Sequence, residues 1–185
     1  MLPQYFNQTT RVMRYTILSL IIASFLVTGC EKPIDYEKEK AAIIAVINQE
    51  TDAYLARDYE ACCATHVHDS LNMRLTAGPD GYVFLQGWDQ VQKHLMSDQT
   101  EDDLNPELHI NVEKYNYRMK IYPQSAFVVC DQTWTASYGE DVTTIQSIQV
   151  RFMEKVEDDW KISFVSWVGT SGYQEIEETE ELYEE

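Results

Sequence analysis

The chain has 185 residues, with 31 Asp or Glu against 14 Lys or Arg, so its formal net charge is −17. Affinity for nucleic acid comes mainly from neutralised phosphates, so this charge argues against a nucleic-acid partner. The same charge would be repelled by anionic lipid headgroups, so membrane attachment would need an anchor rather than a basic surface.

Residues 1–29 have the organisation of a secretory signal. Arg11 and Arg14 precede an uncharged segment at 15–28, which would span roughly 21 Å as a helix, short of the ~30 Å hydrocarbon core. The following "VTGC" resembles a bacterial lipobox, which implies cleavage before Cys30 and lipidation of its thiol. An uncleaved anchor and a plain secretory signal are the alternatives.

Cleavage would leave 12 basic and 31 acidic residues, a net charge of −19. We expect a lipid-anchored protein of the cell envelope whose domain is periplasmic or extracellular. Aspartate after the cysteine often retains bacterial lipoproteins in the inner membrane, so Glu31 favours the outer membrane where one exists. Residues 30–36 are predicted as a tether and 37–172 as one domain. The tail at 173–185 is strongly acidic and is predicted to be disordered.

The domain is predicted to begin with helices. Asp35 is placed to cap a long amphipathic helix, and a break near Asp58 leads to a shorter one. A strand is expected at 71–77, followed by a turn at "GPDG". A third helix is expected at 87–99, and a polar loop at 98–108 then leads into the second half of the domain.

From residue 109 apolar residues recur at every second position, and this alternation predicts strands. Four runs are separated by hairpin-type loops and predict an antiparallel meander: 109–123, 125–138, 143–156 and 160–169. Three sets of residues are each expected to share one face: Tyr115, Tyr117, Met119 and Ile121; Val128, Cys130, Gln132 and Trp134; Ile148, Val150 and Phe152. Helices segregated against an antiparallel sheet indicate the α+β class.

Three stretches carry a resemblance to a known superfamily: "YLARDYEACCATHVHDS", "GPDGYVFLQGWDQVQKHL" and "WKISFVSWV". Over residues 36–170 the chain resembles the nuclear transport factor 2-like superfamily, including its SnoaL-like branch. The resemblance implies a cystatin-like cone, in which a strongly bent antiparallel sheet wraps around a long N-terminal helix and leaves a pocket at the open end. Members include isomerases, cyclases, dehydratases and transport factors, so the fold alone does not choose a function.

The segment "HVHD" is a candidate metal or proton-transfer site. His66, His68 and Asp69 carry metal-binding groups, but no third histidine has a clear place beside them. The alternative is a loop in which Asp69 caps a turn. A third reading places one histidine at the pocket mouth, where it would exchange protons near neutral pH. We expect no bound metal, and the lack of a dinucleotide or P-loop motif predicts no cofactor.

Isomerases of the superfamily use an aspartate base in an apolar pocket. No residue of this chain matches the isomerase pattern position for position, so the catalytic residues of those enzymes are not carried over. Asp131 joins His66 and His68 only as a candidate proton shuttle, and a solvated strand aspartate is the simpler interpretation. Arg74 and Arg118 are scarce positive residues, each able to hold a ligand carboxylate or to form a surface ion pair.

Aromatic residues suggest a ligand site, since small-molecule pockets are apolar with a few polar groups. The ligand-binding candidates are Tyr54, Trp88, Tyr115, Trp134 and Trp167, with ordinary core packing as the alternative. The preferred function is binding of a small, partly apolar molecule. The alternatives are an isomerase, cyclase or hydrolyase that uses a His or Asp proton shuttle, and a homodimer that uses the open sheet face.

Three cysteines remain besides the anchor. Cys62 and Cys63 are adjacent on a predicted helix, so at most one is expected to face Cys130. One disulfide with one free thiol is an alternative, and three buried free thiols are favoured because free cysteine packs as a small apolar residue.

Overall fold

The structure is a computed structural model that describes residues 33–97 and 107–170. By compactness the chain divides into Met1–Pro33 and Ile34–Glu185, and every element described below belongs to the second unit. Several predictions fall outside the described residues: the signal segment at 1–29, lipidation at Cys30, the disordered tail at 173–185 and much of the polar loop.

The helices begin at the predicted caps. The Asp35 carboxylate accepts a hydrogen bond from a backbone amide in the first turn of helix α2 (Tyr36–Leu55). The Asp58 carboxylate does the same for the short helix α3 (Tyr59–Ala64). Helix α4 (Trp88–Ser97) starts directly after Gly87, which has a positive φ of 87° that favours glycine.

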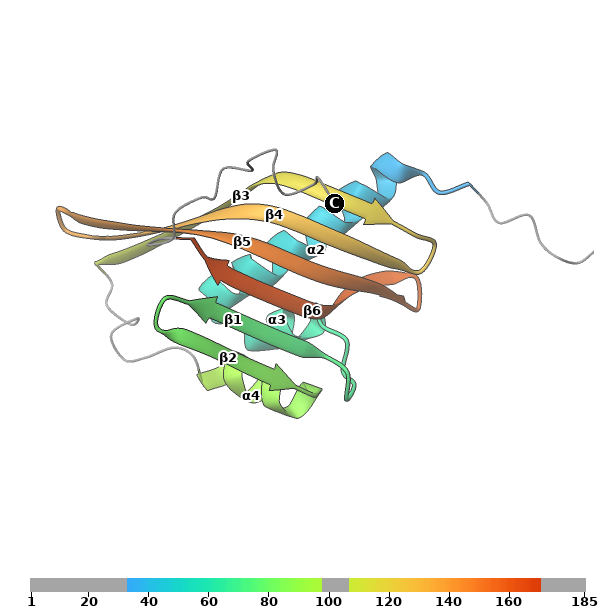
Figure 1. Ribbon diagram of the computed structural model, residues 1–185, viewed down its shortest axis with the longest axis horizontal. Coiled ribbons are helices and arrows are strands. Elements are labelled where there is room, and N and C mark those ends of the chain that lie inside the picture. Colours follow the sequence, from blue (N-terminus) through green and yellow to red (C-terminus); the bar gives the residue numbers. More distant parts are fainter. Residues whose placement is uncertain (1–32, 98–106, 171–185) are drawn as a thin grey trace, which may run out of the picture. The chain divides into compact units, whose positions relative to one another are not determined.

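Six strands form one sheet: β1 (Met73–Gly78), β2 (Gly81–Gln86), β3 (Leu108–Ile121), β4 (Ser125–Tyr138), β5 (Asp141–Val156) and β6 (Asp159–Gly169). Their order in space is β2-β1-β6-β5-β4-β3. The β1–β6 pair is parallel, and every other pair is antiparallel. The last four strands are the predicted meander, and β6 joins it to the β1–β2 hairpin (Figure 1).

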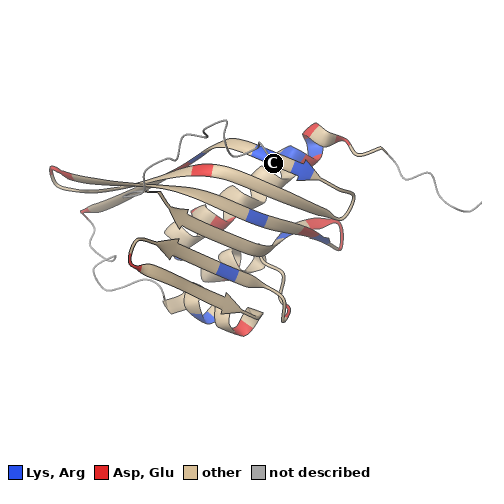
Figure 2. Ribbon diagram, viewed as in Figure 1, with Lys and Arg blue, Asp and Glu red and all other residues tan. Residues whose placement is uncertain are grey.

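Helix α2 covers one face of the bent sheet, which gives the α+β, cystatin-like architecture expected (Figure 1). Ile43 and Ile47 of α2 are fully buried against inward-facing residues of β4, β5 and β6, such as Val128, Met153 and Ile162. A second cluster holds α4 in place, because Val91 and Leu95 pack with residues of α2 and α3. Charged positions are sparse along the central strands (Figure 2).

One strand was not predicted. Strand β2 (Gly81–Gln86) lies between the "GPDG" turn and α4, in a stretch for which no element was predicted. It pairs with β1 through the tight turn and forms the edge of the sheet, with most of its residues exposed. The run "GYVFLQ" has no period of two, so alternation gave no signal for a strand here.

A β-bulge corrects the predicted face of β3. The register of β3 against β4 shifts between Tyr115 and Arg118, and Asn116 has a positive φ of 52°. Tyr117, Met119 and Ile121 therefore pack toward the core, whereas Tyr115 is 41% exposed on the opposite face. The prediction that Tyr115 shares their face was wrong, because one extra residue reverses the alternation.

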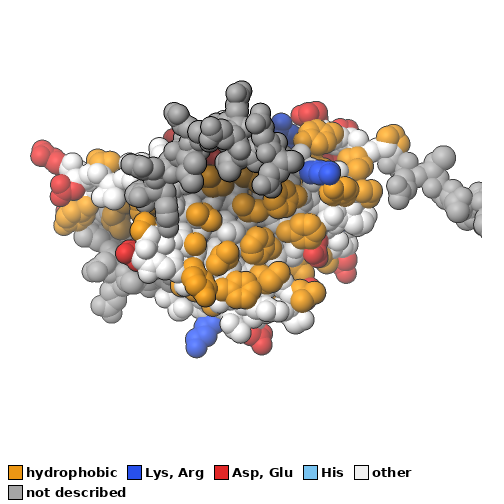
Figure 3. All heavy atoms as spheres, in the orientation of Figure 1, with side chains coloured by type: hydrophobic (Ala, Val, Ile, Leu, Met, Phe, Trp, Pro, Cys, Tyr) orange, Lys and Arg blue, Asp and Glu red, His pale blue; other side chains and the backbone are white. Residues whose placement is uncertain are grey.

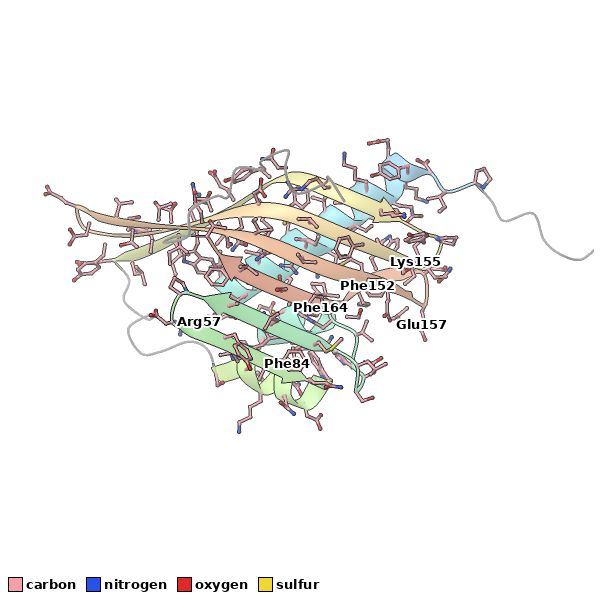
Figure 4. The ribbon with its side chains drawn as sticks, viewed as in Figure 1. Arg57, Phe84, Phe152, Lys155, Glu157 and Phe164 are labelled. Carbon is pink, nitrogen blue, oxygen red and sulfur yellow. The ribbon has the colours of Figure 1, made fainter. Side chains whose placement is uncertain are left out.

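The outer face of the sheet, opposite α2, is rich in apolar side chains. Phe127, Phe152 and Phe164 are direct cross-strand neighbours on β4, β5 and β6, and Leu75 pairs with Phe84 on β1 and β2. Figure 3 shows the apolar atoms gathered over these strands, and Figure 4 shows Phe84, Phe152 and Phe164 on the same side. Ile148, Val150 and Phe152 do share a face, as predicted, and that face is the outer one.

Cys62, Cys63 and Cys130 are all buried and free, as expected for cysteines that pack as apolar residues. In the described part of the chain, no helix is both long enough and apolar enough to cross a bilayer.

Candidate functional cavity

A cavity of about 430 Å³ lies on the inner side of the sheet, between α2, α4 and the strands. Its apolar walls come from four of the strands and two helices: Tyr54, Val83, Leu95, Trp134, Ile145, Val165 and Trp167. Its polar lining consists of Glu50, Thr51, Arg74, Thr76, His94, Gln132, Gln149 and Arg151. Apolar walls with a small set of converging polar groups are typical of small-molecule sites.

An ion pair lies at the floor of this cavity, which we define as Glu50, Arg74, Gln132, Gln149 and Arg151. Glu50 Oε2 of α2 accepts a hydrogen bond from Arg151 Nη2 of β5 at 2.9 Å. Both residues are almost fully buried, at 6% and 1% exposed. Burial alone would raise the pKa of the Glu50 carboxyl, but Arg151 and His66 lower it well below its ordinary range, so the carboxylate is ionised.

The ion pair continues into a chain of amides. Gln149 Oε1 accepts hydrogen bonds from Arg151 Nε and Nη2 at 3.2 and 2.9 Å. Gln149 Nε2 then donates to Gln132 Oε1 at 2.9 Å. Buried side-chain networks of this kind hold their members in one arrangement, so the floor is preorganised.

Two guanidinium groups at the floor keep free donors. Arg151 Nη1 and Arg74 Nε are both buried without a hydrogen-bond partner among the described residues. Arg74 comes from β1, next to β6, so it reaches the cavity from the side opposite β4 and β5. The two cations therefore approach the same space from different parts of the sheet.

His66 lies behind the floor. Its Nε2 is 3.7 Å from Glu50 Oε1, longer than a hydrogen bond, so the contact is electrostatic. Neither ring nitrogen has a hydrogen-bond partner among the described residues, and the ring contacts Trp88 at a centroid distance of 5.8 Å. Burial lowers the pKa of His66, and the carboxylate of Glu50 offsets this only in part.

Three of the five predicted ligand-binding aromatics meet at the cavity. Tyr54 from α2, Trp134 from β4 and Trp167 from β6 all line it. The structure does not bring the other two there. Trp88 stacks on the ring of His68 at 3.9 Å and 12°, and Tyr115 lies on the outer side of the β3 bulge.

The histidine segment does not form a convergent site. His68 Nε2 is 2.8 Å from the Cys63 carbonyl oxygen, and its ring packs on Trp88 rather than beside His66. Asp69 Oδ1 accepts hydrogen bonds from the amides of Leu71 and Asn72, which is the turn-capping role given as the alternative. Among the described residues there is no group of three or more His, Cys, Asp or Glu able to hold a metal ion.

Asp131 lies on the outer face of the sheet, away from the cavity. Its carboxylate accepts from Arg118 Nη2 and from Asn116 Nδ2, each at 2.8 Å. Arg118 is thereby engaged in a largely exposed ion pair, whereas Arg74 lines the cavity. The two arginines singled out from the sequence thus have different roles.

Sequence reasoning missed the buried pair. Glu50 occupies the same helical face as Ile43, Ile47 and Tyr54, so a charge within an apolar stripe was the available signal. Arg151 shares the inner face of β5 with Gln149 and Met153. The more apolar residues of that strand, Ile148, Val150 and Phe152, face outward. The apolar pattern of β5 therefore pointed to the wrong face as the buried one.

No protein-family model matches the chain, and no curated protein matches it in sequence at a significant level. Many solved structures have a similar fold. One is a nuclear transport factor 2-like protein of unknown function from Shewanella oneidensis, 18% identical, with a TM-score of 0.52 over 70% of this chain and 98% of that one.

Two further neighbours are a ketosteroid isomerase-like protein from Erwinia carotovora atroseptica and the β subunit of benzoate 1,2-dioxygenase from Burkholderia mallei. The first is 18% identical, with a TM-score of 0.51 over 71% of this chain and 95% of that one. The second is 14% identical, with a TM-score of 0.59 over 75% and 92%. These similarities show that the chain has the nuclear transport factor 2-like, or cystatin-like, fold.

Proposed function

We propose that this domain binds a small, partly apolar molecule in the cavity. The observation that carries the proposal is the combination of three aromatic wall residues with the preorganised polar floor: Tyr54, Trp134 and Trp167 above Glu50, Gln149 and Arg151. The volume of about 430 Å³ suits a ligand of one to three rings, and pockets of roughly 300–1,000 Å³ are usual for such ligands.

The test is a panel of one- to three-ring compounds that are neutral, anionic or cationic, measured by thermal shift and calorimetry. A compound that binds the native state must raise its melting temperature. Thr76→Phe would fill the cavity from β1 and should abolish binding, whereas Thr133→Phe makes the same change on the outer face of β4 and should not. If no compound binds, or if Thr76→Phe binds as well as the wild type, the proposal fails.

Proton-transfer catalysis is a second candidate function, favoured by one observation. His66 and Glu50 form a buried acid–base pair whose carboxylate lines the cavity, and shifted pKa values of this kind cluster at functional sites. A ligand with an acidic C–H bond should then exchange that hydrogen for deuterium when bound, as followed by NMR. Unchanged exchange in a Glu50→Gln variant that still binds the ligand would exclude this role.

We also propose that the outer face of the sheet pairs with a second copy of the chain. Phe127 and Phe152 are exposed neighbours on this face, and the half-buried Phe164 continues their apolar row. Larger exposed apolar patches mark interaction sites. Light scattering should give a dimer, and Phe152→Lys should shift it to a monomer. Leu71→Lys, at an exposed apolar residue outside the sheet, is the control. A wild-type monomer at high concentration would contradict the proposal.

For location, we propose that the protein is a lipoprotein of the cell envelope, attached through Cys30, with the outer membrane favoured where the cell has one. The support is the lipobox-like "VTGC" after a short uncharged segment. The protein should fractionate with membranes and gain the mass of acyl chains, and Cys30→Ser should release it. Its net charge of −17 further supports the absence of a nucleic-acid partner.

A further inference from the structure

The direction of the hydrogen bonds at the cavity floor narrows the class of ligand. A guanidinium has only donors, so the side-chain oxygen of Gln149 must face Arg151. The amide nitrogen of Gln149 must then face Gln132, whose own oxygen receives that hydrogen bond. This leaves the NH₂ group of Gln132 as the end of the chain, so the relay presents a donor at its open end.

The two arginines add further donors to the same floor. Arg151 Nη1 and Arg74 Nε are buried and have no partner among the described residues, and both side chains line the cavity. A buried donor without an acceptor is unfavourable, so these groups favour a ligand that supplies acceptor atoms.

The charge of the floor points the same way. Glu50 is the only acid among the described residues that line the cavity, and its Oε2 is already bound to Arg151. Arg74 and Arg151 against Glu50 give a net charge of +1 with His94 neutral. The cavity is therefore locally positive within a chain whose net charge is −17.

We infer that the ligand is a ring-bearing monocarboxylate. Its carboxylate, which only accepts hydrogen bonds when ionised, binds Arg74, Arg151 Nη1 and the Gln132 amide. Its ring packs between Trp134 and Trp167. This inference rests on the proposed binding function and adds the chemistry of the head group to it.

The test compares three probes that share one ring system and differ in the head group: 2-naphthoate, 2-naphthalenemethanol and 2-naphthylmethylamine. Calorimetry on the wild-type protein should give a Kd for the carboxylate at least about tenfold below that for the alcohol, as charge-assisted hydrogen bonds predict. The amine should bind no better than the alcohol.

Variants then test whether the cavity floor causes the preference for a carboxylate. Arg74→Gln should raise the Kd for 2-naphthoate by about tenfold and change the Kd for the alcohol by less than about threefold. Arg74→Lys, which keeps the charge without the planar fork, should restore part of the preference. Arg118→Gln makes the same change on the outer face of β3 and should leave all three affinities unchanged. The wild-type comparison does not depend on whether any variant folds.

The outcomes separate the inference from the function beneath it. If the alcohol or the amine binds as tightly as the carboxylate, the cavity binds small molecules but the head-group assignment is wrong. A carboxylate preference that survives Arg74→Gln in a folded protein would overturn the role of Arg74. If none of the three probes binds, the head-group inference fails, and the wider compound panel then decides whether the cavity binds any other small molecule.

Discussion

Glu50 on α2 and Arg151 on β5 are joined by an ion pair of 2.9 Å that is shielded from solvent. The pair connects the long helix to the inner face of the sheet at the point where the cavity begins. Arg151 also holds Gln149, so one guanidinium organises the helix contact and the amide chain together.

Breaking this pair should destabilise the fold strongly. Arg151→Met leaves the Glu50 carboxylate buried without its partner, which should lower the free energy of unfolding by about 3–5 kcal/mol. The double variant Glu50→Leu with Arg151→Met removes both charges and should recover most of that loss. Urea unfolding of the single and double variants measures both effects.

The control is the exposed pair between Arg118 and Asp131, whose arginine side chain is 59% exposed. Arg118→Met should lower stability by at most about 1 kcal/mol, because solvent screens such pairs. An equal loss from Arg118→Met and Arg151→Met would contradict the importance assigned to burial.

Stability should fall as the pH drops below 6.5 because of His66. Burial lowers its pKa in the folded state below the ordinary value of 6.5, so the unfolded chain binds more protons at that position. The stability that comes from burying a neutral His66 is fully present above pH 6.5, and it is lost as the pH falls toward the pKa of His66 in the folded state. Urea unfolding at pH 7, 6 and 5 should show this slope. His66→Gln should flatten it, and an unchanged slope would show that His66 does not carry the effect.

Lys114 should destabilise the fold at neutral pH. Burial, with a contribution from Arg151, lowers the pKa of its ammonium group to about 8, although Nζ donates a hydrogen bond to Thr51. The unfolded chain therefore binds more protons between about pH 8 and 10.5, so stability should rise with pH across that window. Lys114→Met should raise stability at pH 7 by about 1–3 kcal/mol, and its advantage should shrink near pH 10.

Lys120→Met is the matched control, since Lys120 is exposed and pairs with Phe127 on the outer face. The Lys120→Met variant still contains Lys114, so it should keep the rise in stability between about pH 8 and 10.5 that Lys114→Met removes. If Lys114→Met is destabilising at pH 7, the hydrogen bond to Thr51 outweighs the cost of burying the charge.

The buried cysteines should resist thiol reagents. Burial raises the pKa of Cys62 to about 12 and also raises the pKa values of Cys63 and Cys130, so the reactive thiolate is scarce. In a Cys30→Ser variant, a disulfide reagent at pH 8 should titrate almost no thiol in the native state and all three after unfolding in guanidinium. Rapid labelling of the native protein would mean that this core opens readily.

The features that helix caps and apolar periodicity determine could be predicted from the sequence. Asp35 and Asp58 cap the first two helices as expected, and Gln132 shares the inner face of β4 with Trp134. The errors have local causes. The bulge near Asn116 inserts one residue and turns Tyr115 outward, which no alternation pattern reveals.

The polar floor was harder to predict for a different reason. Pattern analysis assumes that the more apolar side of a strand is buried, but β5 buries Arg151 and exposes Phe152. Glu50 has the same character on α2, since it is one charge within an apolar stripe. Burial of either Glu50 or Arg151 alone would be unfavourable. Each is explained only by its ion pair with the other, 101 positions away in the chain.

The parallel pairing of β1 with β6 determines when the cavity can form. Arg74 on β1 and Gln132 on β4 come from parts of the sheet that only β6 joins, and Asn72 also bonds to the Ile162 carbonyl, 90 positions later. Such distant pairings form late because the chain must first close a long loop. The cavity is therefore completed by β6, which follows the other described strands in the sequence. A chain truncated before Asp159 would keep most of the residues that line the cavity but would have no site.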